Sequence, residues 1–333
     1  MNTQSSKQKP KILVARAIFP EALAKLEESF EVRSNQEDRI FSPEELQKEL
    51  AEVVGALVAG SERINSHALA YAKELKVVAN ISVGYNNFDV PVMTAAGVMA
   101  TNTPDVLTDT TADFGFALLM ATARRVTESE HWVRAGQWDK WSIVNNPLGM
   151  DLHHSTLGII GMGRIGQGIA KRALGFGMNV IYHNRSHLSE ANEKACGAQY
   201  VSKEELLRTS DHVVLVLPYS AESHHTIGAK EIALMKPTAT LINIARGGIV
   251  DDAALARALK EKRIFAAGLD VFEGEPTVHP ELLKLSNVVL APHIASATEK
   301  TRRAMVDLAV DNLCAALDGK KPPSLINAEV FNG

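Results

Sequence analysis

The stretch that decides the fold is residues 157–166, which read LGIIGMGRIG. Its first four residues form a short apolar run, typical of a buried β-strand, and its glycines then make a turn. Residues 167–174, which follow directly, have the spacing of apolar side chains that is typical of a helix. The stretch therefore predicts a strand, a tight glycine turn and a helix in direct succession.

Each glycine has a separate task in such a unit. Gly161 makes the tight turn, Gly163 lets the backbone come close to a phosphate, and Gly166 lets the helix pack closely on the strand. The first turn of the helix offers unpaired N–H groups and a positive dipole end, which attract an anion. We therefore expect a dinucleotide to contact the loop residues Gly161, Gly163, Arg164, Ile165 and Gly166.

Similar apolar runs recur on both sides of this unit. Continuous runs of this length, separated by helix-sized segments, indicate parallel strands that are covered on both faces. We therefore expect an α/β fold of two doubly wound parallel-sheet domains, a Rossmann NAD(P)-binding domain and a flavodoxin-like substrate-binding domain. Before the glycine loop, the expected strands are residues 12–17, 55–59 and 77–79, with helices at 21–28 and 66–72. After it, the expected strands are residues 179–182, 199–201, 212–217, 240–244, 266–269 and 288–290.

Two domains are also what the length suggests, because 333 residues are long for one domain and comfortable for two. A long helical region is expected at residues 108–135, and another helix at residues 299–317. The last helix could pack back on the first domain, which would make that domain discontinuous. We expect a substrate-binding domain of residues 1–103 and 298–333 and an NAD(P)-binding domain of residues 104–297.

Composition excludes several classes of partner. The net charge of −4 gives no broad basic field, so nucleic acid and anionic membranes are poor candidates. Residues 1–10 are polar, no apolar run reaches the length of a membrane span, and the two cysteines are too few for a disulfide framework. We therefore expect a cytoplasmic protein that acts on a small molecule.

The residue that should contact the adenosine ribose lies about 20 positions beyond the glycine loop and is an acid in NAD-binding proteins. Asn184 occupies that place, and no carboxylate stands beside it. Arg185 and Ser186 could bind a 2′-phosphate through charge-assisted hydrogen bonds, although Arg185 could also be an ordinary solvated arginine. We expect Asn184, Arg185 and Ser186 to contact the cofactor, and NADPH to be preferred over NADH.

Three charged residues lie just beyond expected strands, at the sheet edge where open parallel sheets bind ligands. Arg246 follows the strand at 240–244, Glu275 lies in the loop after the strand at 266–269, and His293 follows the strand at 288–290. Hydride transfer to a ketone needs a proton donor and a cation for the substrate carboxylate.

We assign these two tasks to the same three residues. His293 would protonate the carbonyl oxygen, and Glu275 would orient its imidazole and support the protonated form. Arg246 would bind the substrate carboxylate and polarise the carbonyl. Each residue alone could be structural, but the three together, in a domain with a nucleotide loop, favour catalysis.

Together these features resemble a known family, the D-isomer-specific 2-hydroxyacid dehydrogenases, and most closely their glyoxylate/hydroxypyruvate reductase (2-ketogluconate reductase) branch. The resemblance covers nearly the full length and rests on five motifs in order. They are SVGYNNFD at 82–89, the loop at 161–166, NIARG at 243–247, GLDVFEGEP at 268–276 and PHIASAT at 292–298.

The resemblance implies further contacts. The backbone N–H groups of Val83 and Gly84 would bind the substrate carboxylate together with Arg246. A small turn at a strand end exposes such donors, although an ordinary tight turn would look the same in sequence. The resemblance further implies that Asp270 meets the nicotinamide carboxamide, that Thr110 and Ala245 contact the cofactor, and that Ser296 lies near the substrate.

The resemblance also implies a homodimer formed by a helical arm at about residues 109–153. Trp132, Trp138 and Trp141 lie in that arm, and large aromatic side chains suit an interface. Trp141 could reach the neighbouring subunit's pocket or simply pack within the arm, and the sequence does not decide between the two.

Two rival functions stay open at this stage. An NAD-linked sibling such as D-3-phosphoglycerate dehydrogenase has the same machinery, and a nucleotide-sensing corepressor-like protein can keep the same fold. We expect no metal site, because the adjacent pairs at residues 153–154 and 224–225 should have diverging side chains and no acid at ligand spacing. The favoured 2-oxo acid is not fixed by the sequence.

Overall fold

The computed structural model describes residues 9–331 and divides into two compact units. The first holds the described residues up to Leu107 and those from Thr298 onward, and the second is Thr108–Ala297. The chain enters the second unit where a helix begins at Thr108, four residues after the predicted start of that domain at residue 104. Most of the polar segment at residues 1–10 lies outside the described residues.

The first unit is built on a parallel sheet in the order β2-β1-β3-β4-β5. This is the strand order of flavodoxin-like doubly wound sheets. In chain order the strands are β1 (Lys11–Val14), β2 (Glu31–Ser34), β3 (Gly55–Val58), β4 (Val77–Asn80) and β5 (Met99–Thr101).

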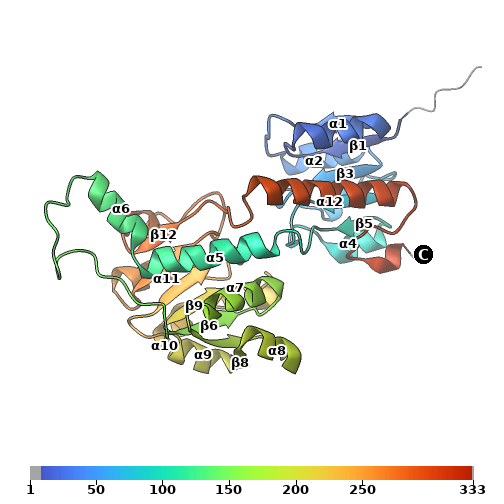
Figure 1. Cartoon of the computed structure of the whole chain (residues 1–333). Helices are drawn as coiled ribbons and strands as arrows, with labels where there is room; N and C mark the ends of the chain where they lie inside the picture. The colour runs from blue at the N-terminus through green and yellow to red at the C-terminus, as the bar shows by residue number, and fades with distance from the viewer. Residues whose placement is uncertain (1–8, 332–333) are drawn as a thin grey trace, which may run out of the picture. The chain divides into compact units, whose positions relative to one another are not determined.

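Helices cover both faces of this sheet, because a parallel sheet has apolar side chains on each side. Ile12 and Val14 of β1 pack in one core cluster with α1 and α12, whereas Leu13 packs in the other with α2 and α3. Figure 1 shows α12 beside α1 although the two come from opposite ends of the chain. The helices are α1 (Pro20–Ser29), α2 (Pro43–Leu50), α3 (Ser66–Leu69), α4 (Val90–Ala95) and α12 (Glu299–Leu317), followed by the 3₁₀ turn η3 (Ala328–Val330).

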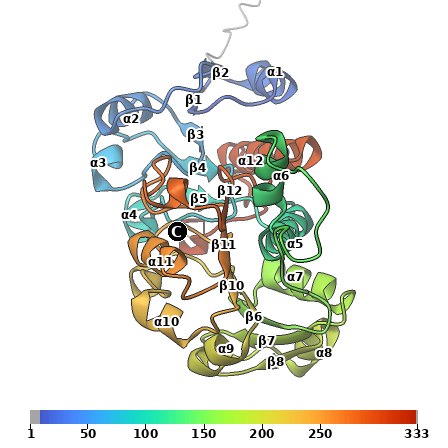
Figure 2. The same ribbon diagram turned by 90° about the vertical axis from the view of Figure 1, so that its left-hand side faces the viewer.

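The second unit has a parallel sheet in the order β12-β11-β10-β9-β6-β7-β8. The chain builds β6 to β8 outward on one side and then β9 to β12 on the other, so the strand order reverses between β6 and β9, as in a Rossmann fold. Figure 2 shows β6, β7 and β8 side by side at one end of this sheet. The strands are β6 (Thr156–Ile160), β7 (Asn179–His183), β8 (Ala198–Tyr200), β9 (His212–Leu215), β10 (Thr240–Asn243), β11 (Ala266–Leu269) and β12 (Val288–Leu290).

Two layers of helices enclose this second sheet. One core cluster joins α5 and α7 to apolar residues of β6, β7 and β9, and the other joins α9, α10 and α11 to the opposite face. The helices are α5 (Thr108–Ala123), α6 (Val126–Arg134), α7 (Arg164–Leu174), α8 (Glu190–Cys196), α9 (Lys203–Thr209), α10 (Ala229–Leu234) and α11 (Asp252–Lys260), with the 3₁₀ turns η1 (Ala221–Ser223) and η2 (Leu282–Lys284). The predicted fold class is confirmed.

Several elements differ from the prediction. β2 was not predicted because its residues, EVRS, are polar and mostly exposed at the sheet edge. The expected helical region at 108–135 consists of two helices, with Arg125 at a left-handed φ of 53° between them. The guanidinium of Arg125 is held there by Glu128 at 2.7 Å. Within residues 9–331, no helix is both long and apolar enough to cross a membrane.

Candidate active site

The glycine loop joins β6 to α7 where the strand order of the second sheet reverses. Gly161 has a φ of +101°, and a Cβ there would lie 2.6 Å from the backbone nitrogen of Leu217, so only glycine fits. Gly163 is the N-cap of α7, and a Cβ there would meet nothing within 4 Å. The loop is therefore open beside the N–H groups of α7, a geometry that fits the pyrophosphate of a dinucleotide.

Asn184 supports the glycine loop from the end of the next strand. Its side-chain oxygen accepts a hydrogen bond of 2.7 Å from the N–H of Met162. Arg185 and Ser186, which follow, are both exposed. The asparagine at the expected ribose position therefore accepts a hydrogen bond from the protein itself, and the exposed Arg185 offers a cation beside it.

The three residues that we assigned to catalysis lie after neighbouring strands of the second sheet. Arg246 follows β10, Glu275 lies in the loop after β11, and His293 follows β12. Because the strands are parallel, their carboxyl ends lie at one edge of the sheet, together with the end of β6 that leads into the glycine loop.

His293 and Glu275 form a direct pair. The imidazole Nδ1 lies 2.8 Å from Glu275 Oε2, and the N–H of Phe272 donates to Glu275 Oε1 at 2.9 Å. About half of the His293 side chain is exposed, at 47%. With Nδ1 directed at the carboxylate, the other ring nitrogen, Nε2, is the one left to meet a substrate.

The charges around this pair support an ionised glutamate. Burial raises the pKa of the Glu275 carboxyl, but the hydrogen bond and charge of His293, the Phe272 N–H and the charge of Arg246 outweigh it and hold the pKa below its usual value. Burial lowers the pKa of the Arg246 guanidinium, against the charge of Glu275. Arginine nevertheless keeps its charge in proteins, so Arg246 can bind a carboxylate.

Asp270 fixes the backbone that carries His293. This aspartate is 1% exposed, and its two carboxylate oxygens accept hydrogen bonds from the N–H groups of Ile294 at 2.8 Å and Ala295 at 2.9 Å. Its carbonyl oxygen accepts the N–H of His293 at 2.9 Å. His293 itself has a left-handed φ of 55°, a conformation that needs such support.

The other predicted contact residues are spread along the second unit. Arg164 and Ile165 begin α7, and Thr110 lies in the first turn of α5. Ala245 is buried, and its N–H donates to the Asn243 side chain at 3.0 Å. Ser296 lies in the turn after His293 and is partly exposed.

In the first unit, Val83 and Gly84 follow β4 at the carboxyl edge of that sheet. Neither N–H group donates a hydrogen bond to any of residues 9–331. Within residues 9–331 both N–H groups therefore remain without an acceptor, as binding of an anion would require.

Asp252 was missed by the sequence reasoning. It is 3% exposed at the start of α11, and its carboxylate accepts the N–H of Glu273 at 2.9 Å, two residues before Glu275. Burial raises the pKa of this carboxyl. In sequence, the adjacent acids Asp251 and Asp252 indicate only the start of a helix, so this contact had no local signal.

The expectation for one histidine pair was wrong. The rings of His224 and His225 do not diverge but stack, with centroids 3.8 Å apart and planes 22° apart. The pair lies outside regular structure, and His225 has a left-handed φ of 50°. An acid also stands nearby, since Glu273 lies 3.1 Å from His225 Nε2. One ligand atom from each of His224, His225 and Glu273 lies within 4.8 Å of the others, a spacing at which the three could hold a metal ion.

Comparison with known proteins places this site in context. Residues 116–295 match the NAD binding domain of the D-isomer specific 2-hydroxyacid dehydrogenases. A glyoxylate reductase of Thermococcus onnurineus is 48% identical over 327 residues, which cover 97% of this chain and 98% of that protein. A glyoxylate reductase of Pyrococcus furiosus is 48% identical over 326 residues, with 97% of each chain covered.

Solved structures show the same likeness. The NADPH-dependent glyoxylate/hydroxypyruvate reductase of Sinorhizobium meliloti, in complex with NADP and malonate, has a TM-score of 0.86 and 36% identity, covering 97% of this chain and 98% of that one. A putative D-isomer specific 2-hydroxyacid dehydrogenase from Polaromonas has a TM-score of 0.88 and 37% identity, covering 96% and 99%.

Proposed function

Because this chain belongs to the D-isomer-specific 2-hydroxyacid dehydrogenase family, in its glyoxylate reductase branch, we propose that it is an NADPH-preferring reductase of small 2-oxo acids. The proposed substrates are glyoxylate and hydroxypyruvate, with 2-ketogluconate as a larger candidate, and the products are D-2-hydroxy acids. The observation that carries the proposal is the His293–Glu275 pair at 2.8 Å, on the sheet edge that also bears the glycine loop.

The residues divide the chemistry between them. NADPH, when bound, would supply the hydride that reduces the carbonyl carbon. His293 then donates the proton on Nε2 to the carbonyl oxygen, while Glu275 holds Nδ1 and keeps the ring oriented. Arg246 binds the substrate carboxylate with its guanidinium and draws electron density from the carbonyl. The proposal also assigns the backbone N–H groups of Val83 and Gly84 to the substrate carboxylate.

The NADPH preference rests on the edge beyond β7. Arg185 and Ser186 are exposed there, and residues 183–187 contain no carboxylate to repel a 2′-phosphate. Arg185→Ala should therefore raise KM for NADPH about 10-fold or more while KM for NADH changes little, since charge-assisted hydrogen bonds to phosphate are lost. Arg263→Ala, which removes another exposed arginine of the same unit, is the matched control.

The direct test of the activity is NADPH oxidation with glyoxylate, hydroxypyruvate and 2-ketogluconate offered separately. Turnover of at least one is expected. No turnover with any of the three would contradict the proposal and favour a nucleotide-sensing protein. Equal or better kcat/KM with NADH would refute the cofactor preference alone.

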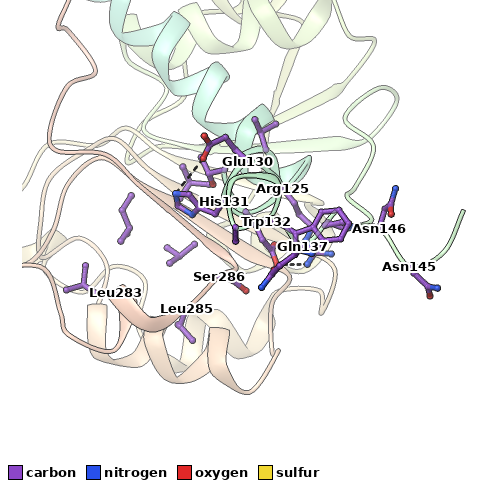
Figure 3. A pocket seen from close by; sticks show the side chains of 18 residues that line it. Arg125, Glu130, His131, Trp132, Gln137, Asn145, Asn146, Leu283, Leu285 and Ser286 are labelled. Carbon is purple, nitrogen blue, oxygen red and sulfur yellow. Dashed lines mark hydrogen bonds and ion pairs between the residues drawn. The ribbon is translucent and has the colours of Figure 1, made fainter. Parts of the chain in front are cut away.

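The proposal includes a homodimer formed through the arm. α6 has no buried residue, and the segment after it exposes Trp138 at 53% and Trp141 at 73%. A groove of about 950 Å³ lies between α6, residues 145–147 of the arm and the segment from η2 to β12, with Trp132 and Leu285 in its lining (Figure 3). Apolar surface of this kind is typical of an interface.

Solution mass tests this part. Light scattering after size exclusion should give twice the chain mass of 36.1 kDa, and Trp141→Ser with Ile143→Ser should shift it toward the monomer. A wild-type mass of one chain would remove the dimer from the proposal.

A further inference from the structure

The turn at residues 82–84 is held by an unusual set of contacts. Three consecutive carbonyl oxygens each accept a hydrogen bond from the first unit itself. Ser82 O accepts the N–H of Thr103 at 2.9 Å, Val83 O accepts Asn102 Nδ2 at 2.8 Å, and Gly84 O accepts Asn80 Nδ2 at 2.9 Å.

These contacts fix the direction of the N–H groups. In a planar trans peptide, the C=O of one residue and the N–H of the next point in opposite directions. With the carbonyls of residues 82 and 83 turned toward their donors, the N–H groups of Val83 and Gly84 must point the other way. This explains why neither N–H finds an acceptor among residues 9–331.

The asparagines are themselves firmly placed. Asn80 is fully buried, and its Nδ2 also donates to the side-chain oxygen of Asn87 at 3.2 Å. Asn87 Nδ2 in turn donates to the carbonyls of Ala59 and Glu62, both at 2.9 Å. The loops after β3 and β4 are thereby joined behind the turn.

One polar atom shows the cost of this arrangement. The Asn80 Oδ1 is buried without a hydrogen-bond partner among the described residues. An unpaired buried oxygen is unfavourable, so a native structure that keeps one usually does so for a purpose. A flipped amide would place that oxygen against Gly84 O, so the nitrogen must face the turn.

Asn102 is anchored by the returning end of the chain. Its carbonyl oxygen accepts Asn312 Nδ2 of α12 at 3.2 Å and the Ser324 hydroxyl at 2.7 Å. Asn312 is fully buried. The C-terminal part of the first unit therefore supports the turn, because α12 and the segment after it hold Asn102, whose side chain donates to Val83 O.

We propose that Asn80 and Asn102 are positioning residues that hold the backbone N–H groups of Val83 and Gly84 outward as a preformed binding site for a substrate carboxylate. This inference rests on the proposed function for the identity of the anion. Asn80 and Asn102 are not among the site residues that the sequence predicted, and their contacts are what would make the turn a site for an anion.

Asn102→Ala tests the inference. Loss of the donor to Val83 O should free the peptide between residues 83 and 84, raise KM for glyoxylate and the Ki of malonate about 10-fold, and leave kcat and NADPH affinity within about twofold. Asn102→Asp, which keeps the shape but cannot donate, should behave like the alanine variant. Asn65→Ala removes a side chain that caps α3 in the same unit and should leave both constants unchanged.

Malonate binding to the protein with NADP⁺ gives a readout that does not depend on turnover. If the wild type binds malonate and folded Asn102→Ala binds it equally well with unchanged KM, the inference is overturned and the proposed reductase function stands. If the wild type binds malonate but reduces none of the 2-oxo acids, the proposed function fails, and weaker malonate binding by the Asn102 variants would still support the clamp. Asn80→Ser offers a second variant if Asn102→Ala does not fold, with the same expected rise in the malonate constant.

Discussion

Asp270 can hold the backbone that carries His293 or contact the nicotinamide carboxamide, and its replacement by asparagine should distinguish these two roles. The carboxylate accepts N–H groups from Ile294 and Ala295 at 2.8 and 2.9 Å. Asparagine keeps one acceptor oxygen but turns an N–H₂ group toward the second N–H. One charge-assisted hydrogen bond is lost and a buried donor is left unpaired, at a cost of about 1–3 kcal/mol.

Part of that cost is offset. Burial raises the pKa of the Asp270 carboxyl, against the two N–H bonds and the charge of His293, so the ionised form is itself disfavoured by the protein interior. A neutral amide removes that penalty. We therefore expect a net loss of about 1–2 kcal/mol in the free energy of unfolding, or a fall in Tm of about 2–4 °C per kcal/mol for a unit of this size.

The effect on activity should be much larger than the effect on stability. His293 is the neighbour of Ile294, and a shift of about 1 Å in the imidazole can reduce the rate roughly 10²-fold. Steady-state kinetics with glyoxylate should show a kcat loss of this size, and fluorescence titration should show NADPH binding within about twofold of wild type. Asp211→Asn is the matched control, since Asp211 accepts the N–H of Thr156 and pairs with Lys236, away from His293.

Two outcomes would refute this reasoning. Unchanged kcat in Asp270→Asn, with a stability loss equal to that of Asp211→Asn, would show that the contacts with Ile294 and Ala295 do not position His293. Weakened NADPH binding with normal kcat at saturation would assign Asp270 to the nicotinamide carboxamide, as the family resemblance implies.

The remaining predictions concern charge. Glu275→Gln keeps an acceptor for His293 Nδ1 but loses the carboxylate charge, so kcat should fall roughly 10²-fold, and a kcat within twofold of wild type would contradict its role. His212 is fully buried, and burial lowers its pKa below the usual 6.5. Below pH 6.5 the unfolded chain therefore binds a proton at His212 that the folded protein does not bind. This group should lower the free energy of unfolding by at most about 1.4 kcal/mol for each pH unit below 6.5. Urea unfolding at several pH values should show this slope, and His212→Asn should show a shallower one; equal slopes would contradict the assignment.

The fold was predictable because its signals are local. The run at residues 157–160 and the three glycines after it define strand, turn and helix by themselves, and all seven strands of the second sheet overlap strands expected from the sequence. β2 gave no such signal, because a polar edge strand is held by pairing with β1 and not by its own side chains. The break at Arg125 was equally hidden, since its contact with Glu128 forms only once both helices exist.

What the sequence predicted of the candidate site is the gathering of its charged residues at one sheet edge. Arg246, Glu275 and His293 are charged residues at strand ends, where topology alone brings them to one edge. The partners of Asp270 and the donor to Val83 O depend on backbone directions in loops, and sequence spacing does not encode these. The same limit explains the stacked histidines at 224 and 225, whose acid comes from a distant loop.

The role of His293 as proton donor is tested most directly by comparing wild type and His293→Gln in the NADPH-dependent reduction of glyoxylate, with NADPH affinity measured in parallel. We expect turnover by the wild type, a loss of roughly 10²–10⁴-fold in kcat for the variant, and unchanged NADPH binding. A His293→Gln protein that keeps the wild-type kcat would contradict the assignment of His293 as the proton donor.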